Sequence, residues 1–168
     1  ANLTQALPRV IEESQDASNA WSITLRESTQ GTNPSAVHAD FVNAGSRSTY
    51  STPANSITAN TWYHTEITYD GSGVSAIYIN GVSQPLSNIT GNVHGTAPTL
   101  NIGRRTDNQR YFNGQVDDVK IYNYIRTQKQ IIEDMNASHP NVGSPIGSAV
   151  GYWKFDEGYG SVLHDSSQ

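Results

Sequence analysis

Adjacent acidic residues are the first side chains in this sequence that could carry out chemistry. A retaining glycosidase needs two carboxyl groups about 5 to 5.5 Å apart, and acids spaced by two on one strand share a face and meet this need. The acidic groups of this chain are Glu12-Glu13 with Asp16, Asp117-Asp118, Glu133-Asp134 and Asp156-Glu157. None places two acids two residues apart on a predicted strand. Motifs of serine hydrolases, zinc proteases and phosphate-binding loops are also absent from the sequence, so we predict that the protein is not an enzyme.

Sugar recognition is chemistry that the loops of this chain could supply. Aromatic rings stack on the apolar faces of pyranose rings, while amides, acids and arginines hydrogen-bond to the hydroxyl groups. The stretch 104–111 combines these residue types. The candidate ligand-binding residues are Tyr50, Arg104, Asp107, Asn108 and Tyr111. The alternative is that these residues belong to an ordinary β-sandwich surface, where Tyr and Asn are also common.

Composition limits the classes of protein to consider. The 168 residues fit one ordinary domain, and without cysteine that domain has neither disulfides nor thiolate chemistry. Charged residues make up only 15% of the chain, a profile more typical of an extracellular or cell-surface β protein than of a cytosolic helical one. The formal net charge of −5 argues against nucleic acid as a partner. No apolar run is long enough to predict a membrane span.

Alternating apolar and polar residues predict the elements that position these side chains. Turn residues Asp70-Gly71 and Asn80-Gly81 separate some of the strands and predict a meander. The predicted strands lie at 20–28, 63–69, 76–80, 99–105 and 115–124. We therefore predict an all-β fold, an antiparallel β-sandwich or jelly roll, with one short helix near 128–136.

The helix has its own local signals. Thr127 and Gln130 fit a capping box, and Ile131, Ile132 and Met135 follow at helical spacing. The next residues, 137–149, are rich in Pro, Gly and Ser and are predicted to be a linker.

Three motifs occur in an order and spacing that resemble those of one known family. They are "NTWYHTEITYDGSGVSAIYINGVSQP" (60–85), "LNIGRR" (100–105) and "YFNGQVDDVKIYNYIRTQKQII" (111–132). The sequence resembles the laminin-G-like, concanavalin A-like lectin/glucanase jelly roll family. In the resembling motif the position of His64 is commonly a packed structural histidine. The remaining histidines have no metal-ligand spacing and are expected at the surface: His38, His94, His139 and His164.

The end of the chain resembles the beginning of a domain of the same family. That beginning typically reads W-x-F/L-D-E-G-x-G followed by D-x-S-G, and here it corresponds to 153–160 followed by 165–167. We therefore divide the chain into a jelly roll at 1–136 that lacks its usual first strands, a linker at 137–149, and the first strand of a following copy at 150–168. Trp153 and Phe155 alternate with polar neighbours. We expect this strand to complete the sandwich, within the same chain or by exchange between chains; the alternative is a disordered tail.

The resemblance also implies a structural calcium ion. In the family, the D-x-S-G loop and the acidic pair after F-x-G-x often meet around this ion, which prefers oxygen ligands. The metal candidates by this comparison are Asp117, Asp118 and Asp165. The chain departs from the family pattern where Gly is usual after D-x-S, because Ser167 or Gln168 stands there. The alternative is that Asp117 and Asp118 accept hydrogen bonds from turn N–H groups.

Together these features favour a non-catalytic binding module for carbohydrate or cell-surface recognition, within a larger exported multidomain protein. The main alternative is a structural or adhesive repeat that forms homo-oligomers through strand exchange. A glycoside hydrolase is the third hypothesis.

Overall fold

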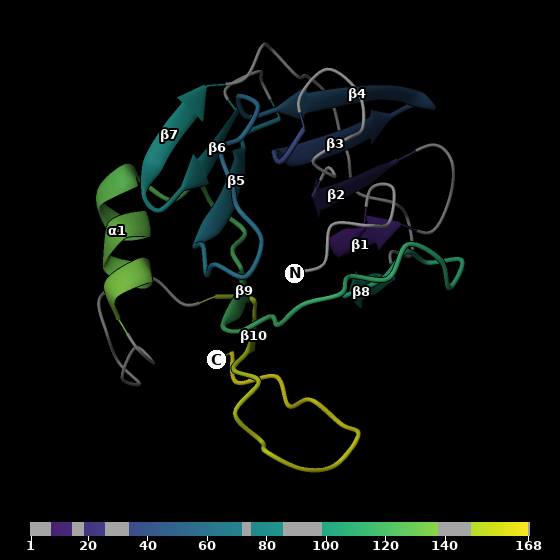
Figure 1. The fold of residues 1–168 in the computed structure, drawn as a ribbon, viewed down its shortest axis with the longest axis vertical. Helices are drawn as coiled ribbons and strands as arrows, with labels where there is room; N and C mark the ends of the chain where they lie inside the picture. The colour runs from purple at the N-terminus through teal and green to yellow at the C-terminus, as the bar shows by residue number, and fades with distance from the viewer. Residues whose placement is uncertain are drawn as a thin grey trace.

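The computed structural model describes residues 8–14, 19–25, 34–71, 75–85, 99–137 and 149–167. In these ranges the chain forms three antiparallel sheets and one short helix (Figure 1). This architecture confirms the predicted antiparallel β-sandwich with a helix near 128–136.

The largest sheet has five strands in the spatial order β4-β3-β2-β1-β8. It consists of β1 (Arg9–Ser14), β2 (Ala20–Leu25), β3 (Val37–Asn43), β4 (Ser46–Ser51) and β8 (Leu100–Ile102). Alternation along β3 directs Val37, Ala39 and Phe41 to one face, where they form a buried cluster with Ile57 and Ile77. This cluster is the core, and alternate residues of β2 pack against it from the same sheet.

The second sheet is a meander of β5 (Thr65–Tyr69), β6 (Ser75–Ile79) and β7 (Val82–Pro85). Asn80 and Gly81 join β6 to β7 with φ angles of 49° and 75°. A two-residue hairpin turn with positive φ at both positions matches the right-handed twist of its strands, so the predicted Asn-Gly turn is observed. Gly81 is also constrained by packing, since a Cβ atom there would lie 2.7 Å from Cγ1 of Ile132.

Helix α1 (Gln128–Asn136) begins at the predicted cap. The Thr127 hydroxyl accepts a hydrogen bond from the backbone N–H of Gln130, and the Gln130 side chain accepts one from the Thr127 N–H. The buried face of the helix includes Ile131. Figure 1 shows α1 beside the sheet of β5–β7, and the side chain of Gln128 donates to the Gly81 carbonyl at 2.9 Å.

A third, two-stranded sheet joins β9 (Val119–Ile121) to β10 (Gly151–Trp153). Beyond β10, the chain forms a loop that projects away from the sheets in Figure 1. The bridge between Trp153 and Asp165 closes this loop. Of the predicted linker, residues 138–148 lie outside the described residues.

Several expectations need correction. The predicted strand at 115–124 is short, because only Val119–Ile121 pairs with a neighbour in the described residues. Strands β1, β3 and β4 were not predicted at all. His38 was expected at the surface but is only 1% exposed, since it lies in the middle of the sheet on β3. His94, His139 and Asp16 fall outside the described residues.

Candidate functional site

A row of polar side chains crosses all five strands of the larger sheet on the face opposite the core. Glu12 of β1 pairs with Ser22 of β2, and Ser22 pairs with Asp40 of β3. The row is completed at its ends by pairing with β8 and β4. In spatial order the members are Asn101, Glu12, Ser22, Asp40 and Thr49, and we call them the polar row.

A β-bulge in β1 directs a cation into this row. Arg9 and Glu12 are three positions apart, so in a regular strand they would point to opposite faces. The register shifts between Arg9 and Ile11, and a bulge of this kind adds one residue that is not paired. Arg9 therefore shares the face of Glu12, while Ile11 is buried opposite Ile23.

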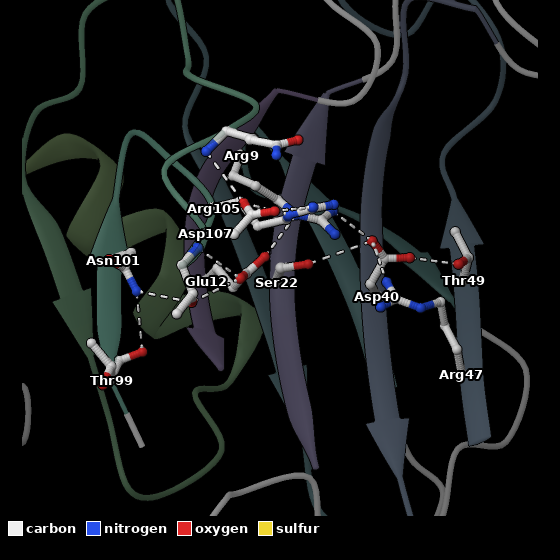
Figure 2. Close-up of polar contacts among 12 residues, drawn as sticks. Arg9, Glu12, Ser22, Asp40, Arg47, Thr49, Thr99, Asn101, Arg105 and Asp107 are labelled. Atoms are coloured by element: carbon white, nitrogen blue, oxygen red, sulfur yellow. Dashed lines mark hydrogen bonds and ion pairs between the residues drawn. The ribbon is translucent and has the colours of Figure 1, made fainter. Parts of the chain in front are cut away.

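Arg9 joins the two carboxylates of the polar row, as Figure 2 shows. Its Nη1 lies 2.8 Å from Oδ2 of Asp40, and its Nε lies 2.8 Å from Oε2 of Glu12. The second contact is close enough for an ion pair but is too bent to be a good hydrogen bond. Asp40 also accepts from the hydroxyl groups of Thr49 at 2.5 Å and Ser22 at 3.5 Å.

All three charged side chains of this network are buried. Removing charges from water is costly, and their mutual attraction compensates only when the partners are well placed and hydrogen-bonded. Loss of one partner from a buried pair typically costs about 3 to 5 kcal/mol, because the other charge stays buried without compensation. Arg9, Glu12 and Asp40 therefore fix the positions of β1, β2 and β3 relative to one another.

The loop at 103–112, which follows β8, is anchored to β1 directly above the network. The N–H of Gly103 donates to the Val10 carbonyl at 2.8 Å, and the N–H of Arg9 donates to the Arg110 carbonyl at 2.9 Å. The loop closes on itself where the N–H of Phe112 donates to the Gly103 carbonyl at 2.7 Å. These bonds hold both ends of the 103–112 loop at one edge of the polar row.

Thr106 connects this loop to the buried network. Its N–H and hydroxyl donate to Oε1 of Glu12 at 3.2 and 3.1 Å. The side chain of Asn101 donates to the Thr106 hydroxyl at 3.1 Å. Glu12 thus uses one oxygen for Arg9 and the other for the loop, so the conformation of the loop depends on the buried ion pairs.

The outer surface of the loop carries polar and aromatic side chains. Arg105 and Asp107 form a two-pronged ion pair, with Arg105 Nε donating to Asp107 Oδ1 at 2.8 Å. This hydrogen bond holds the pKa of Asp107 below its usual range. Asn108 is exposed beside the pair, and Tyr111 keeps 51% of its surface in solvent. These groups could stack on and hydrogen-bond to a sugar ring.

Four of the five predicted ligand-binding residues lie together in this loop: Arg104, Asp107, Asn108 and Tyr111. The structure does not bring Tyr50 to them. Tyr50 lies on β4 opposite Ala39 and packs against the core, with its ring centroid 6.4 Å from that of Phe41. The polar row was missed by sequence reasoning, which sought paired acids within one strand.

The three metal candidates gather around one buried tyrosine. The hydroxyl of Tyr152 donates to Asp118 Oδ1 at 2.7 Å, and its N–H donates to Asp165 Oδ1 at 2.9 Å. Asp117 accepts the N–H of Asp118 at 3.0 Å. Within the described ranges, no three His, Asp or Glu side chains converge in a way that could hold a metal ion. As they lie, the carboxylates of Asp117, Asp118 and Asp165 accept hydrogen bonds from O–H and N–H donors, and calcium stays a prediction of the resemblance.

A separate group of titratable residues lines a cavity of about 1120 Å³ between the sheets. Burial, reinforced by the charge of Asp134, raises the pKa of Glu66 to about 7. Burial also lowers the pKa of His64. Asp134 is itself held by Arg126 at 2.5 Å and by the hydroxyl of Tyr122 at 3.0 Å. Both contacts go to Oδ2 of Asp134, and its Oδ1 is buried without a hydrogen-bond partner among the described residues.

The match to a family model agrees with this architecture. Residues 1–132 match the family Laminin_G_3, described as the concanavalin A-like lectin/glucanases superfamily. No curated protein sequence matches the chain. Among solved structures, the chain is similar to part of an S-layer domain-containing protein from Clostridium thermocellum. The identity is 13% and the TM-score 0.36, and the match covers 81% of this chain and 66%, just under two thirds, of the other. None of the described segments forms a helix with the length and hydrophobicity needed to cross a membrane.

Proposed function

Because the chain belongs to the concanavalin A-like lectin/glucanase superfamily, we propose that it is a non-catalytic module that binds carbohydrate at the 103–112 loop. One observation carries this proposal: a loop with exposed side chains of the types that contact sugars is fixed to a buried ion network through Thr106 and Glu12. Loops with a fixed conformation bind more tightly than mobile ones, because less conformational entropy is lost on binding.

The chemistry of the loop supports a sugar as the ligand. Tyr111 offers an exposed ring for stacking, and Asn108 and Asp107 offer amide and carboxylate groups for hydroxyls. A non-catalytic role is supported by the carboxylates of the polar row, since Glu12 and Asp40 are both bound to Arg9 and are buried. We place the module outside the cell or at its surface, where glycans are available.

Binding to a glycan array, followed by calorimetry on any glycan bound, tests this proposal. We expect Tyr111→Ala and Asn108→Ala to weaken binding, because each removes a loop contact without touching the buried network. Tyr159→Ala is the matched control, because Tyr159 is a tyrosine 91% exposed on the C-terminal loop, outside the site. Equal affinity of Tyr111→Ala and the wild type, or no bound glycan on a broad array, would contradict the proposal.

The β9–β10 pair favours a second function, assembly through strand exchange. β10 contributes only Gly151–Trp153, and its antiparallel partner β9 has three residues as well. A short strand that follows a predicted linker can pair with β9 of its own chain or of another copy. On this hypothesis residues 150–156 complete the sandwich of residues 1–136, and copies associate end to end or as closed dimers.

Light scattering coupled to size exclusion tests this second function on the full chain and on a chain that ends at residue 149. Exchange predicts a discrete oligomer for the full chain and a monomer or an aggregate for the shortened chain. A full chain that is monomeric at all concentrations would exclude exchange between copies.

A further inference from the structure

The cavity between the sheets passes around the edge of β5. Within the sheets that the described residues form, β5 is the outermost strand of its meander, with β6 as its neighbour. The cavity of about 1120 Å³ is lined by Tyr63 and Ile67, which pack against the core on one face of this strand. It is also lined by His64 and Glu66, which alternate with them and therefore lie on the opposite face. Its volume is slightly above the range of about 300 to 1000 Å³ that is typical of small-molecule sites.

One wall of this cavity is apolar. Alternate residues of β2 line the cavity and are only partly buried, and they are Trp21, Ile23 and Leu25. The residues between them, Ser22 and Thr24, are polar and yet buried. Apolar side chains on the inner face of a sandwich are normally covered, and an apolar group placed in the cavity would cover these. Removing this apolar surface from water would favour the binding of such a group.

The other wall carries two hydrogen-bond acceptors. Glu66 is only partly buried, and its carboxyl group has no hydrogen bond or ion pair among the residues that the structure describes. His64 lies two residues earlier, and two such positions on one strand face are about 7 Å apart, which leaves space for a ligand group between the side chains. Burial lowers the pKa of His64, so its ring is neutral near pH 7 and one ring nitrogen can accept a hydrogen bond.

The charges that face Glu66 come from α1, from β9 and from the segment between them. Asp134 has the strongest influence, and Arg126 and Lys120 oppose it. Both cations have other contacts, since Arg126 is bound to Asp134 and Lys120 Nζ lies 4.9 Å from the centre of the Tyr152 ring. Burial and the charge of Asp134 raise the pKa of Glu66 to about 7. A cation in direct contact with Glu66 would favour its ionised form.

From this cavity we infer that the protein binds a primary amine with an apolar chain, whose ammonium group lies between Glu66 and His64 and whose chain lies along the apolar wall of β2. The site is separate from the exposed surface of the 103–112 loop and does not depend on the proposed carbohydrate binding. An ammonium group has three N–H donors and a positive charge, so it can donate to both acceptors and compensate the Glu66 carboxylate. A hydroxyl group supplies one donor without a charge, and a carboxylate would be repelled by Glu66 and Asp134.

Three ligands with the same linear alkyl chain test the inference on the full chain: decylamine, decan-1-ol and decanoate. We expect calorimetry to show that decylamine binds about tenfold more tightly than the other two, or better, because only the amine can pair with Glu66. Equal or tighter binding of the alcohol or the acid would overturn the inference, since the cavity would then select the apolar chain alone. Failure of decylamine to bind would overturn it as well.

The pH dependence of decylamine binding tests whether Glu66 is the partner. An alkylamine stays protonated in this range, as a lysine side chain does. Ionisation of Glu66 on binding releases its proton, so with a pKa of about 7 the affinity should rise about tenfold from pH 6 to pH 8. The pKa values of Tyr122 and Arg126 are raised, so these groups titrate far above this range. The lowered pKa of His64 places its titration below the ordinary value of 6.5.

A charge-removing variant locates the ammonium group. Glu66→Gln should weaken decylamine binding by about tenfold or more at pH 8, abolish its rise with pH and leave decan-1-ol binding unchanged. Glu133→Gln is the matched control, because Glu133 lies on α1 with 41% of its side chain exposed and is not one of the described residues that line the cavity. A rise with pH that persists in Glu66→Gln would overturn the inference. The comparison of the three ligands needs only the wild type, so it decides the matter even if Glu66→Gln folds poorly.

Discussion

Arg9 Nη1 lies 2.8 Å from Asp40 Oδ2, and this contact joins two buried residues that are 31 positions apart. It spans three adjacent strands, because β2 lies between β1 and β3. Through Glu12 and Thr106 the same cation supports the 103–112 loop. The stability of the sheet and the shape of the proposed binding surface therefore depend on one ion network.

Replacing Asp40 with asparagine should destabilise the protein strongly. Asp40→Asn keeps the size of the side chain but leaves the buried Arg9 charge without its 2.8 Å partner, at an expected cost of about 3 to 5 kcal/mol. Urea unfolding measures this change. Asp107→Asn is the control, because its ion pair with Arg105 lies at the surface, where solvent screens it and it should contribute little to stability. Similar losses for the two variants would show that the network is not a stabilising element.

Alanine substitution at two glycines with the same φ angle distinguishes the cost of backbone strain from the cost of overpacking. Gly71 and Gly81 both have φ of 75°, but among the described residues only Gly81 faces a neighbour, at 2.7 Å from Ile132 Cγ1 to an added Cβ. We expect Gly71→Ala to cost about 1 kcal/mol from backbone strain, and Gly81→Ala to cost about 1 to 3 kcal/mol more from overpacking. Thermal unfolding measures both. Equal decreases in melting temperature for the two variants would mean that α1 can move aside at little cost and is not packed firmly on the hairpin.

Features that depend on neighbours in sequence could be predicted well. The capping box at Thr127 gave the start of α1, and the pair Asn80-Gly81 gave the hairpin, because each signal is contained within a few residues. The grouping of Asp107 with Tyr111 was predictable for the same reason, since both belong to one continuous loop.

Features that depend on strand pairing could not be predicted. β3 was missed because His38 and Asp40 are polar yet buried on the second face of the strand, which hides the usual alternation. The polar row takes one residue from each of five strands, and its cation reaches the row only through a bulge. Periodicity along one strand contains none of this information.

Asp165 should stabilise the C-terminal loop through its negative charge. Its Oδ1 accepts the N–H groups of Tyr152 and Ser167, both at 2.9 Å, and these bonds lower its pKa. Because the pKa is lower in the folded state, this contribution is present above the ordinary value of about 3.8 and is lost as pH falls below it. Asp165→Ala should therefore lower the melting temperature at pH 7, and by less at pH 3.

Chelation separates this role from the predicted calcium ion. If calcium binds at Asp117, Asp118 and Asp165, EDTA should lower the melting temperature of the wild type and leave that of Asp165→Ala unchanged. A wild-type melting temperature that does not respond to EDTA would exclude a tightly bound ion, and the effect of Asp165→Ala would then come from hydrogen bonding alone.

Glu66 should make stability decrease as the pH approaches neutrality. Burial and Asp134 raise its pKa from an ordinary 4.5 to about 7, so between these values the folded protein keeps a proton that the unfolded chain has lost. The stabilisation is fully present below pH 4.5 and disappears as pH rises through about 7. His64 acts in the opposite direction at lower pH, because its pKa is lowered by burial and the unfolded chain takes up a proton first.

Glu66→Gln, which keeps a neutral side chain at every pH, should remove the Glu66 contribution alone. The difference in unfolding free energy between Glu66→Gln and the wild type should then change in favour of the variant from pH 5 to pH 7.5. A constant difference across this range would mean that Glu66 is ionised in the folded protein and is not buried against Asp134.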